Sequence, residues 1–166
     1  RDGNPDLFLL NLQTGGRTKL SAVPGLNISP AWSPDGEWVA LSLSKDGGTN
    51  IYLMRKDGSG LRALTSGSGI SVSPTFSPNG RQIAFTSDRG GTPQIYAIDL
   101  EGTNLRRLTF QGEYNSSPRW SPRGDKIAFA SNQTGRFQIT LMTPAGSDRQ
   151  TLTSEGSNEA PAWSRD

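Results

Sequence analysis

The sequence predicts an all-β protein: a β-propeller of four-stranded antiparallel blades, of which about four lie within the 166 residues. The first observation is an aromatic residue that recurs at intervals of 44, 44 and 43 residues, at Trp32, Phe76, Trp120 and Trp163. The second is that two aliphatic positions keep a period of 44 residues, namely Leu20, Leu64, Leu108 and Leu152, and Leu7, Ile51, Ile95 and Ile139. The third is that no segment combines a sustained 3.6-residue apolar period with helix caps. A repeat of this length without helices indicates stacked β-meanders.

The repeat that begins at Ser73 illustrates the strands expected in one blade. A short strand at 74–77 ends in the sequence Ser-Pro-Asn-Gly, whose proline and glycine suit the corners of a tight turn. Apolar and polar residues alternate at 82–87 and again at 94–100, which is the pattern of half-buried strands. The last expected strand, 105–109, carries two arginines and suits a solvent-exposed outer edge. The short first strand is then innermost, and neighbouring blades bury the two apolar faces.

In chain order, fifteen strands are expected, and they do not divide evenly into blades. The first repeat supplies only a third and a fourth strand, at 6–12 and 17–21, and the chain ends on a lone first strand. A blade shared between the two ends therefore lacks its second strand, and we expect residues upstream of Arg1 to supply it. The predicted repeats are 1–28, 29–72, 73–116 and 117–159, followed by a terminal strand at 160–166.

The composition excludes several kinds of functional site. The chain has no histidine and no cysteine, which removes disulfides, Cys/His zinc sites, thiolate nucleophiles and a Ser-His-Asp triad. The recurrent Ser33, Ser77, Ser121 and Ser164 therefore have no histidine to activate them, and we expect no catalytic role for them. Charges of both signs are interspersed, with a net charge of +2, and no apolar run reaches the ~20 residues of a membrane helix. We expect no nucleic-acid partner, no membrane span, no metal and no cofactor.

The chain resembles the TolB family, the periplasmic propellers of the bacterial Tol-Pal envelope system, over essentially its whole length. The resemblance is carried by the phrases SPAWSPDGEWVALSLSKDGGTNIYLM, SPTFSPNGRQIAFTSDRGGTPQIYAIDL and SPRWSPRGDKIAFASNQTGRFQITLM. It implies a six-bladed ring preceded by a smaller α/β domain, and a non-enzymatic scaffold in the periplasm. It also implies a protein partner, the lipoprotein Pal or another envelope protein, at a face of the ring around the central tunnel. The chain departs from the repeat at Arg165, where the other copies have a turn proline.

Two alternatives stand beside this interpretation. The same repeat occurs in the propeller domains of prolyl-oligopeptidase-type peptidases, so the chain fits a gate whose catalytic domain lies elsewhere. It also fits an excised or engineered repeat fragment, in which two four-blade halves associate to close one ring.

The loops that enter the first strands supply the candidate binding residues. Five positions before each recurrent aromatic the residue is polar, and the neighbouring positions vary in chemistry between repeats. These polar side chains either cap local backbone groups or offer hydrogen bonds to a partner at the tunnel mouth. Variation within a regular repeat marks positions that the fold does not dictate, and we predict a protein-binding site there. The predicted residues are Asn27, Ile28, Ser71, Val72, Glu113, Tyr114, Asn115, Asn158 and Glu159.

Overall fold

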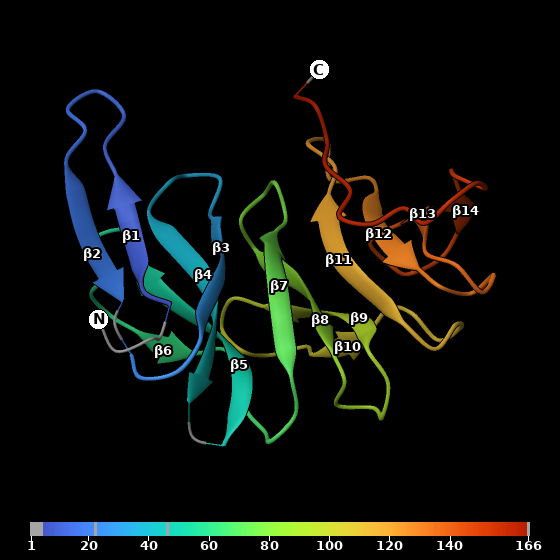
Figure 1. The fold of residues 1–166 in the computed structure, drawn as a ribbon, viewed down its shortest axis with the longest axis horizontal. Helices are drawn as coiled ribbons and strands as arrows, with labels where there is room; N and C mark the ends of the chain where they lie inside the picture. The colour runs from blue at the N-terminus through green and yellow to red at the C-terminus, as the bar shows by residue number, and fades with distance from the viewer. Residues whose placement is uncertain (1–4, 22, 46, 166) are drawn as a thin grey trace.

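The computed structural model describes residues 5–21, 23–45 and 47–165, and within them every helix or strand assigned is a β-strand. The strands form one two-stranded and three four-stranded antiparallel sheets, which follow one another in chain order along the molecule (Figure 1). The all-β prediction and the four-stranded blades are confirmed. The described residues contain no helix long and apolar enough to cross a membrane.

The strands of each sheet are consecutive in the chain, and we call them first to fourth within each four-stranded sheet. The two-stranded sheet pairs β1 (Leu7–Leu10) with β2 (Arg17–Ser21). The first four-stranded sheet contains β3 (Asn27–Trp32), β4 (Trp38–Lys45), β5 (Gly48–Arg55) and β6 (Arg62–Ala63). The second contains β7 (Ser71–Phe76), β8 (Gln82–Ser87), β9 (Gln94–Asp99) and β10 (Arg106–Arg107). The third contains β11 (Asn115–Trp120), β12 (Ile127–Ser131), β13 (Gln138–Met142) and β14 (Gln150–Thr151).

A serine hydroxyl closes the turn between the first and second strands of each four-stranded sheet. It accepts a hydrogen bond from a backbone N–H five residues later, in the pairs Ser33 with Trp38, Ser77 with Gln82 and Ser121 with Lys126, at 2.9, 3.0 and 3.1 Å. The glycine of each turn has a positive φ, 70°, 68° and 74° at Gly36, Gly80 and Gly124, a conformation that costs glycine little. The recurrent serines thus act as turn residues.

Each first strand contains a β-bulge that the sequence analysis missed. The register shifts between Ile28 and Ala31, and Ser29 has a φ of 54°; the equivalent Ser73 and Ser117 have 56° and 55°. The following proline has no N–H to donate to the ladder, so an irregularity is tolerated at this point. The strands consequently begin two residues before the predicted repeat boundaries at 29, 73 and 117 and continue through them.

Apolar side chains fill the spaces between consecutive sheets. Leu41 belongs to a buried cluster against which Leu7 of the two-stranded sheet packs, and Leu53 shares a buried cluster with Phe85 of the next sheet. A third cluster joins the last two sheets. The first strands lie innermost, because β7 packs against both β3 and β11, whereas the two-residue fourth strands pair only with the third strand of their own sheet. Burying one such Phe or Leu side chain contributes about 1.5–3 kcal/mol, so the sheets stabilise one another.

Two of the recurrent aromatic residues, Phe76 and Trp120, are packing residues. Phe76 is buried between the first two four-stranded sheets, and Trp120 packs on the cluster of the last two. Trp32 is half exposed, because the preceding two-stranded sheet offers it no first strand among the described residues.

The predicted terminal strand at 160–166 is not formed, since residues 160–165 belong to no strand and residue 166 lies outside the described residues. In the complete sheets the first strand pairs with the second strand that follows it, and no such strand follows Trp163 in the described chain. The segment nevertheless passes beside β11 (Figure 1), and the Trp163 Nε1–H donates to the Arg119 carbonyl at 3.0 Å. Ala160 also keeps a φ of 52°, the value of the bulge residue in the other repeats.

Candidate functional site

The predicted binding residues lie at one end of the sheets, which we call the mouth end. It is formed by the inter-blade loops, residues 23–26, 64–70, 108–114 and 152–157, and by the turns between second and third strands. Backbone hydrogen bonds join the first three loops to the sheet that each enters, at the end of its second strand or in the turn that follows. The pairs are Ser44 N–H to Leu26 O, Asp88 N–H to Ile70 O and Asn132 N–H to Tyr114 O, at 3.1, 3.1 and 3.0 Å.

Three of the predicted residues are asparagines that brace the inter-blade loops from inside. The Asn115 amide donates to the Gln111 carbonyl at 2.8 Å and to Gln94 Oε1 at 2.9 Å, and its side chain is buried. Asn27 donates to the Val23 carbonyl at 2.7 Å. Asn158 follows the same pattern with the Glu155 carbonyl, also at 2.7 Å. Their amide donors are used within the protein, which favours the capping role over direct contact with a partner.

The predicted residues that face solvent are Glu113, Tyr114 and Glu159, while Ile28 and Val72 are partly buried. The Tyr114 ring packs edge-on against Phe137, with ring centroids 5.4 Å apart and an interplanar angle of 87°. This contact holds an aromatic side chain in place at the surface rather than in the core.

An exposed apolar residue precedes Asn27, Ser71 and Asn115, and the sequence analysis missed it in two of these three repeats. Leu26, Ile70 and Tyr114 occupy equivalent places on consecutive sheets and are 43%, 54% and 42% exposed. The sequence signal that could have identified them is their spacing of 44 residues. A turn does not require a large apolar residue, so three at the same loop position point to another role. Together they form an apolar row along the mouth end.

Ser71 stands where the other repeats have asparagine, and a cavity of about 240 Å³ opens beside it. The cavity is lined by the loop Ser66–Gly69, by Asn50 and Ser87, and by Arg89, which the sequence analysis did not single out. Gly67 has a φ of 126°, which only glycine adopts without strain, and Gly69 O accepts a hydrogen bond from Thr49 N–H at 3.1 Å. The loop is therefore held open without a side chain to fill it.

The Arg89 guanidinium is the cation of this cavity. Its Nε–H donates to Ser87 Oγ at 3.1 Å and its Nη2 to Ser71 Oγ at 3.3 Å, and it lies 5.5 Å from the ring centroids of both Phe85 and Tyr96. No carboxylate of the described residues forms an ion pair with it. Burial lowers the pKa of Arg89 from its usual value, and the neighbouring Tyr96 and Asp88 oppose that shift.

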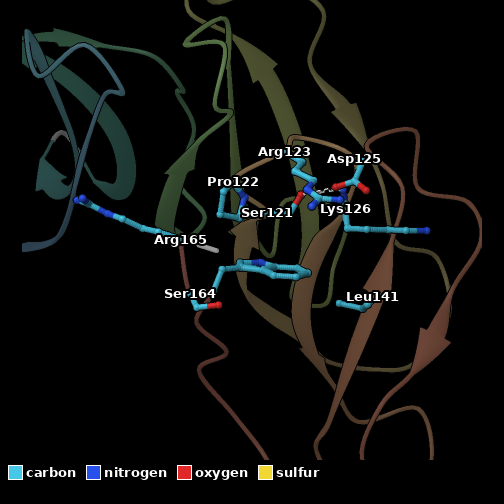
Figure 2. A pocket seen from close by; sticks show the side chains of 9 residues that line it. Ser121, Pro122, Arg123, Asp125, Lys126, Leu141, Ser164 and Arg165 are labelled. Carbon is cyan, nitrogen blue, oxygen red and sulfur yellow. Dashed lines mark hydrogen bonds between the residues drawn. The ribbon is translucent and has the colours of Figure 1, made fainter.

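A second cavity, of about 340 Å³, lies at the other end of the last sheet, against the C-terminal segment. Figure 2 shows Pro122 and Leu141 on the sheet side, Ser164 on the segment, and Arg165 extending away. Within the described residues, no group of three or more His, Cys, Asp or Glu side chains is placed to hold a metal ion.

This second cavity continues the pattern by which consecutive sheets stack. A Cβ built on Gly80 would lie 3.8 Å from Pro34 Cδ, and one on Gly124 would lie 3.6 Å from Pro78 Cδ. Pro34 and Pro78 are thus each covered by the glycine of the next turn, and Pro122 presents the same surface to the C-terminal segment that lines the cavity. We therefore assign the cavity to sheet stacking rather than to a ligand.

Comparison with known proteins agrees with this architecture. The model of the PD40 family, described as the TolB beta propeller domain, matches residues 1–166. The Tol-Pal system protein TolB of Alcanivorax borkumensis is 46% identical over 43 residues, which are 26% of this chain and 10% of that protein.

Solved structures resemble the whole arrangement of sheets. TolB from Acinetobacter baumannii has a TM-score of 0.82 at 34% identity, covering 90% of this chain and 38% of that one. A putative TolB from Agrobacterium tumefaciens has a TM-score of 0.88 at 29% identity, covering 99% and 63%. The chain thus spans less than two thirds of each relative. A puromycin-hydrolyzing peptidase of Mycobacterium tuberculosis, with a TM-score of 0.66 at 21% identity, shares the fold alone.

Proposed function

The chain belongs to the PD40 family of TolB beta propeller domains, and we propose that it is a non-enzymatic scaffold that binds a protein partner in a Tol-Pal-type envelope system. The proposed location is the periplasm, where its TolB-like relatives would act. The proposed partner is a Pal-like lipoprotein, in keeping with the Tol-Pal name of the relative from Alcanivorax borkumensis.

The apolar row at the mouth end carries this proposal. Leu26, Ile70 and Tyr114 remain 43%, 54% and 42% exposed although the backbone around each is hydrogen-bonded and fixed. Repeated exposure of large apolar side chains at one edge of the sheets is typical of a protein-binding surface. The charged Glu113 lies beside Tyr114 in the same loop, Glu159 follows the last inter-blade loop, and the two would form a polar rim. The sheets fix the loops, and loop chemistry selects the partner.

Calorimetric titration with the soluble domain of the Pal-like lipoprotein from the same genome tests the proposal. We expect the double variant Ile70→Ser, Tyr114→Ser to bind at least about tenfold more weakly, because buried apolar and aromatic anchors carry most of the energy of an interface. Glu159→Ala should weaken binding less, as a rim residue. The matched control is Leu105→Ser, which removes a side chain of similar exposure, 44%, from the opposite end of the sheets. Equal affinity of the double variant and the wild type would refute the mouth end as the binding surface.

The propeller of a peptidase is the second candidate, favoured by the fold likeness to the Mycobacterium tuberculosis enzyme. The chain itself contains no histidine to serve a catalytic serine, so catalytic residues would have to come from another domain. A segment of α/β-hydrolase type adjoining this sequence in its gene would support that candidate. A smaller α/β domain upstream would support the TolB-like scaffold.

A further inference from the structure

The cavity beside Ser71 exists because two side chains are shorter here than in the other repeats. Ser71 replaces the asparagine that elsewhere reaches the carbonyl of its own inter-blade loop. Asn50 stands in the place of Gln94 and Gln138, which are longer by one methylene group. The Asn50 side-chain amide still donates to the Gly67 carbonyl at 3.0 Å, so the loop is held in place and a cavity remains beneath it.

Arg89 reaches this space with unused hydrogen-bonding capacity. The equivalent residue in the next sheet is the neutral Gln133. Of the five N–H groups of a guanidinium, two donate to Ser87 and Ser71, and three have no hydrogen-bond partner among the described residues. The two serine hydroxyls bond each other at 3.0 Å, and donation of both protons to a ligand would replace that mutual bond. The cavity therefore offers a cation and two hydroxyl groups to an acceptor.

We propose that this cavity binds a single carboxylate group, with Arg89 as its counter-ion and Ser71 and Ser87 as hydrogen-bond donors. The planar guanidinium matches the two oxygens of a carboxylate. A volume of about 240 Å³ is below the usual range for whole small molecules, and fits one head group with a short stem. The group is either free or carried by a polypeptide.

The charge around Arg89 selects a monovalent anion over a divalent one. Asp88 is the neighbouring carboxylate, and its Oδ1 accepts the Ile70 N–H at 2.7 Å, which fixes it near the cavity. The negative charge of Asp88 acts on Arg89 without an ion pair between them, which leaves less net positive charge to hold a phosphate dianion. The two flanking aromatic rings, of Phe85 and Tyr96, stabilise the cation without neutralising it.

Titration of the full chain with sodium acetate, followed by ¹⁵N NMR, tests the proposal at constant ionic strength. We expect saturable shifts of the Arg89 Nε–H and of the backbone amides of Gly67, Gly69 and Ser71. Arg89→Gln copies the residue of the next sheet and should weaken acetate binding at least about tenfold, because charged hydrogen bonds are lost. Arg81→Gln removes the same charge from the opposite end of the same sheet and should bind acetate like the wild type.

A second variant tests the cavity rather than the charge. Ser71→Asn keeps Arg89 but introduces the asparagine found in the other repeats. The next sheet accommodates this residue in the same surroundings, because Asn115 lies opposite Ser131 as Ser71 lies opposite Ser87. It should fill the cavity and abolish the shifts while the rest of the spectrum stays dispersed. Shifts that do not saturate in the wild type, an acetate affinity of Arg89→Gln equal to that of the wild type, or saturable shifts that persist in Ser71→Asn would overturn the proposal.

Two further titrations identify the ligand. Inorganic phosphate at pH 7.5 should bind more weakly than acetate, and tighter binding of phosphate would overturn the assignment to a carboxylate. A short peptide with a free C-terminus, compared with its amidated form, tells whether a polypeptide end reaches the site. Binding of acetate but not of the peptide assigns the site to free carboxylates. None of these results depends on the lipoprotein partner, so the site and the scaffold function succeed or fail separately.

Discussion

Replacing Asn115 by serine tests whether the asparagines of the mouth end brace the loops. The buried Asn115 amide makes hydrogen bonds of 2.9 Å to Gln94 Oε1 and 2.8 Å to the Gln111 carbonyl, and a serine reaches neither in the same way. Each neutral hydrogen bond contributes about 0.5–1.5 kcal/mol net, so Asn115→Ser should lower the free energy of unfolding by about 1–3 kcal/mol. For a domain of this size that corresponds to a fall in Tm of roughly 3–10 °C.

Urea unfolding followed by tryptophan fluorescence and thermal unfolding followed by circular dichroism measure this loss. The matched control is Asn158→Ser, because Asn158 makes the equivalent bonds, to Gln138 and Glu155, from a more exposed position. Water replaces part of what that side chain loses, and we expect a cost of at most about 1 kcal/mol.

The reasoning fails if Asn115→Ser unfolds at the same urea concentration as the wild type. A variant of unchanged stability that no longer bound the lipoprotein would show that Asn115 contacts the partner directly. A variant that was less stable but kept its affinity below its unfolding transition would confirm the bracing role. The two roles are thus separated by one substitution and two measurements.

Two further predictions concern the stacking of the sheets and the exposed carboxylates. Gly146 and Gly102 have positive φ values of 86° and 84°, so replacing either glycine with alanine should lower the free energy of unfolding by about 1–2 kcal/mol. The new Cβ at position 146 would lie 2.6 Å from a carbonyl oxygen of the preceding sheet, whereas at position 102 the distance would be 3.9 Å. Gly146→Ala should therefore lower the free energy of unfolding, measured in urea, by about 1–3 kcal/mol more than Gly102→Ala does. Equal losses would contradict this stacking contact. Hydrogen bonds from Gln82 and Asn104 lower the pKa of Asp99, so its contribution to stability is present above its unfolded pKa and is lost as pH falls through the lower, folded one. Below about pH 4 the wild type should therefore lose stability more steeply than Asp99→Asn, and parallel pH profiles would contradict that role.

The sequence predicted the repeating part of the fold well because each strand carries its own signal. The alternation at 82–87 coincides with β8, and that at 94–100 extends one residue beyond β9. The bulges escaped prediction because Ser-Pro resembles turn punctuation, whereas in the structure Ser29 lies inside a strand with a positive φ. The terminal strand failed because a first strand forms only by pairing, and the pattern around Trp163 says nothing about its partner.

The site was predicted only in part. The sequence indicated the loops, and Tyr114 among them, because their positions follow from the repeat. It did not reveal Arg89, since the cavity depends on the missing length of two other side chains, Ser71 and Asn50, in three dimensions. The repeat also made Asn27 and Ser71 equivalent positions. In the structure Asn27 braces its loop through a hydrogen bond, whereas Ser71 lies beside a cavity and accepts a hydrogen bond from Arg89. Comparing the lengths of side chains at equivalent positions of the repeats would have indicated the cavity.

The C-terminal segment indicates what determines the shape of the innermost strands. Ala160 adopts the bulge conformation, φ 52°, although no second strand of the described chain pairs with its segment. Strand pairing therefore does not impose the bulge. The contact that remains is with the preceding sheet, through Trp163 and the Arg119 carbonyl, and the bulged Ser117 likewise directs its N–H to Thr86 of the sheet before it. Contacts with the preceding sheet thus accompany the bulge whether or not the strand pairs within its own sheet, so consecutive repeats are coupled through their innermost strands.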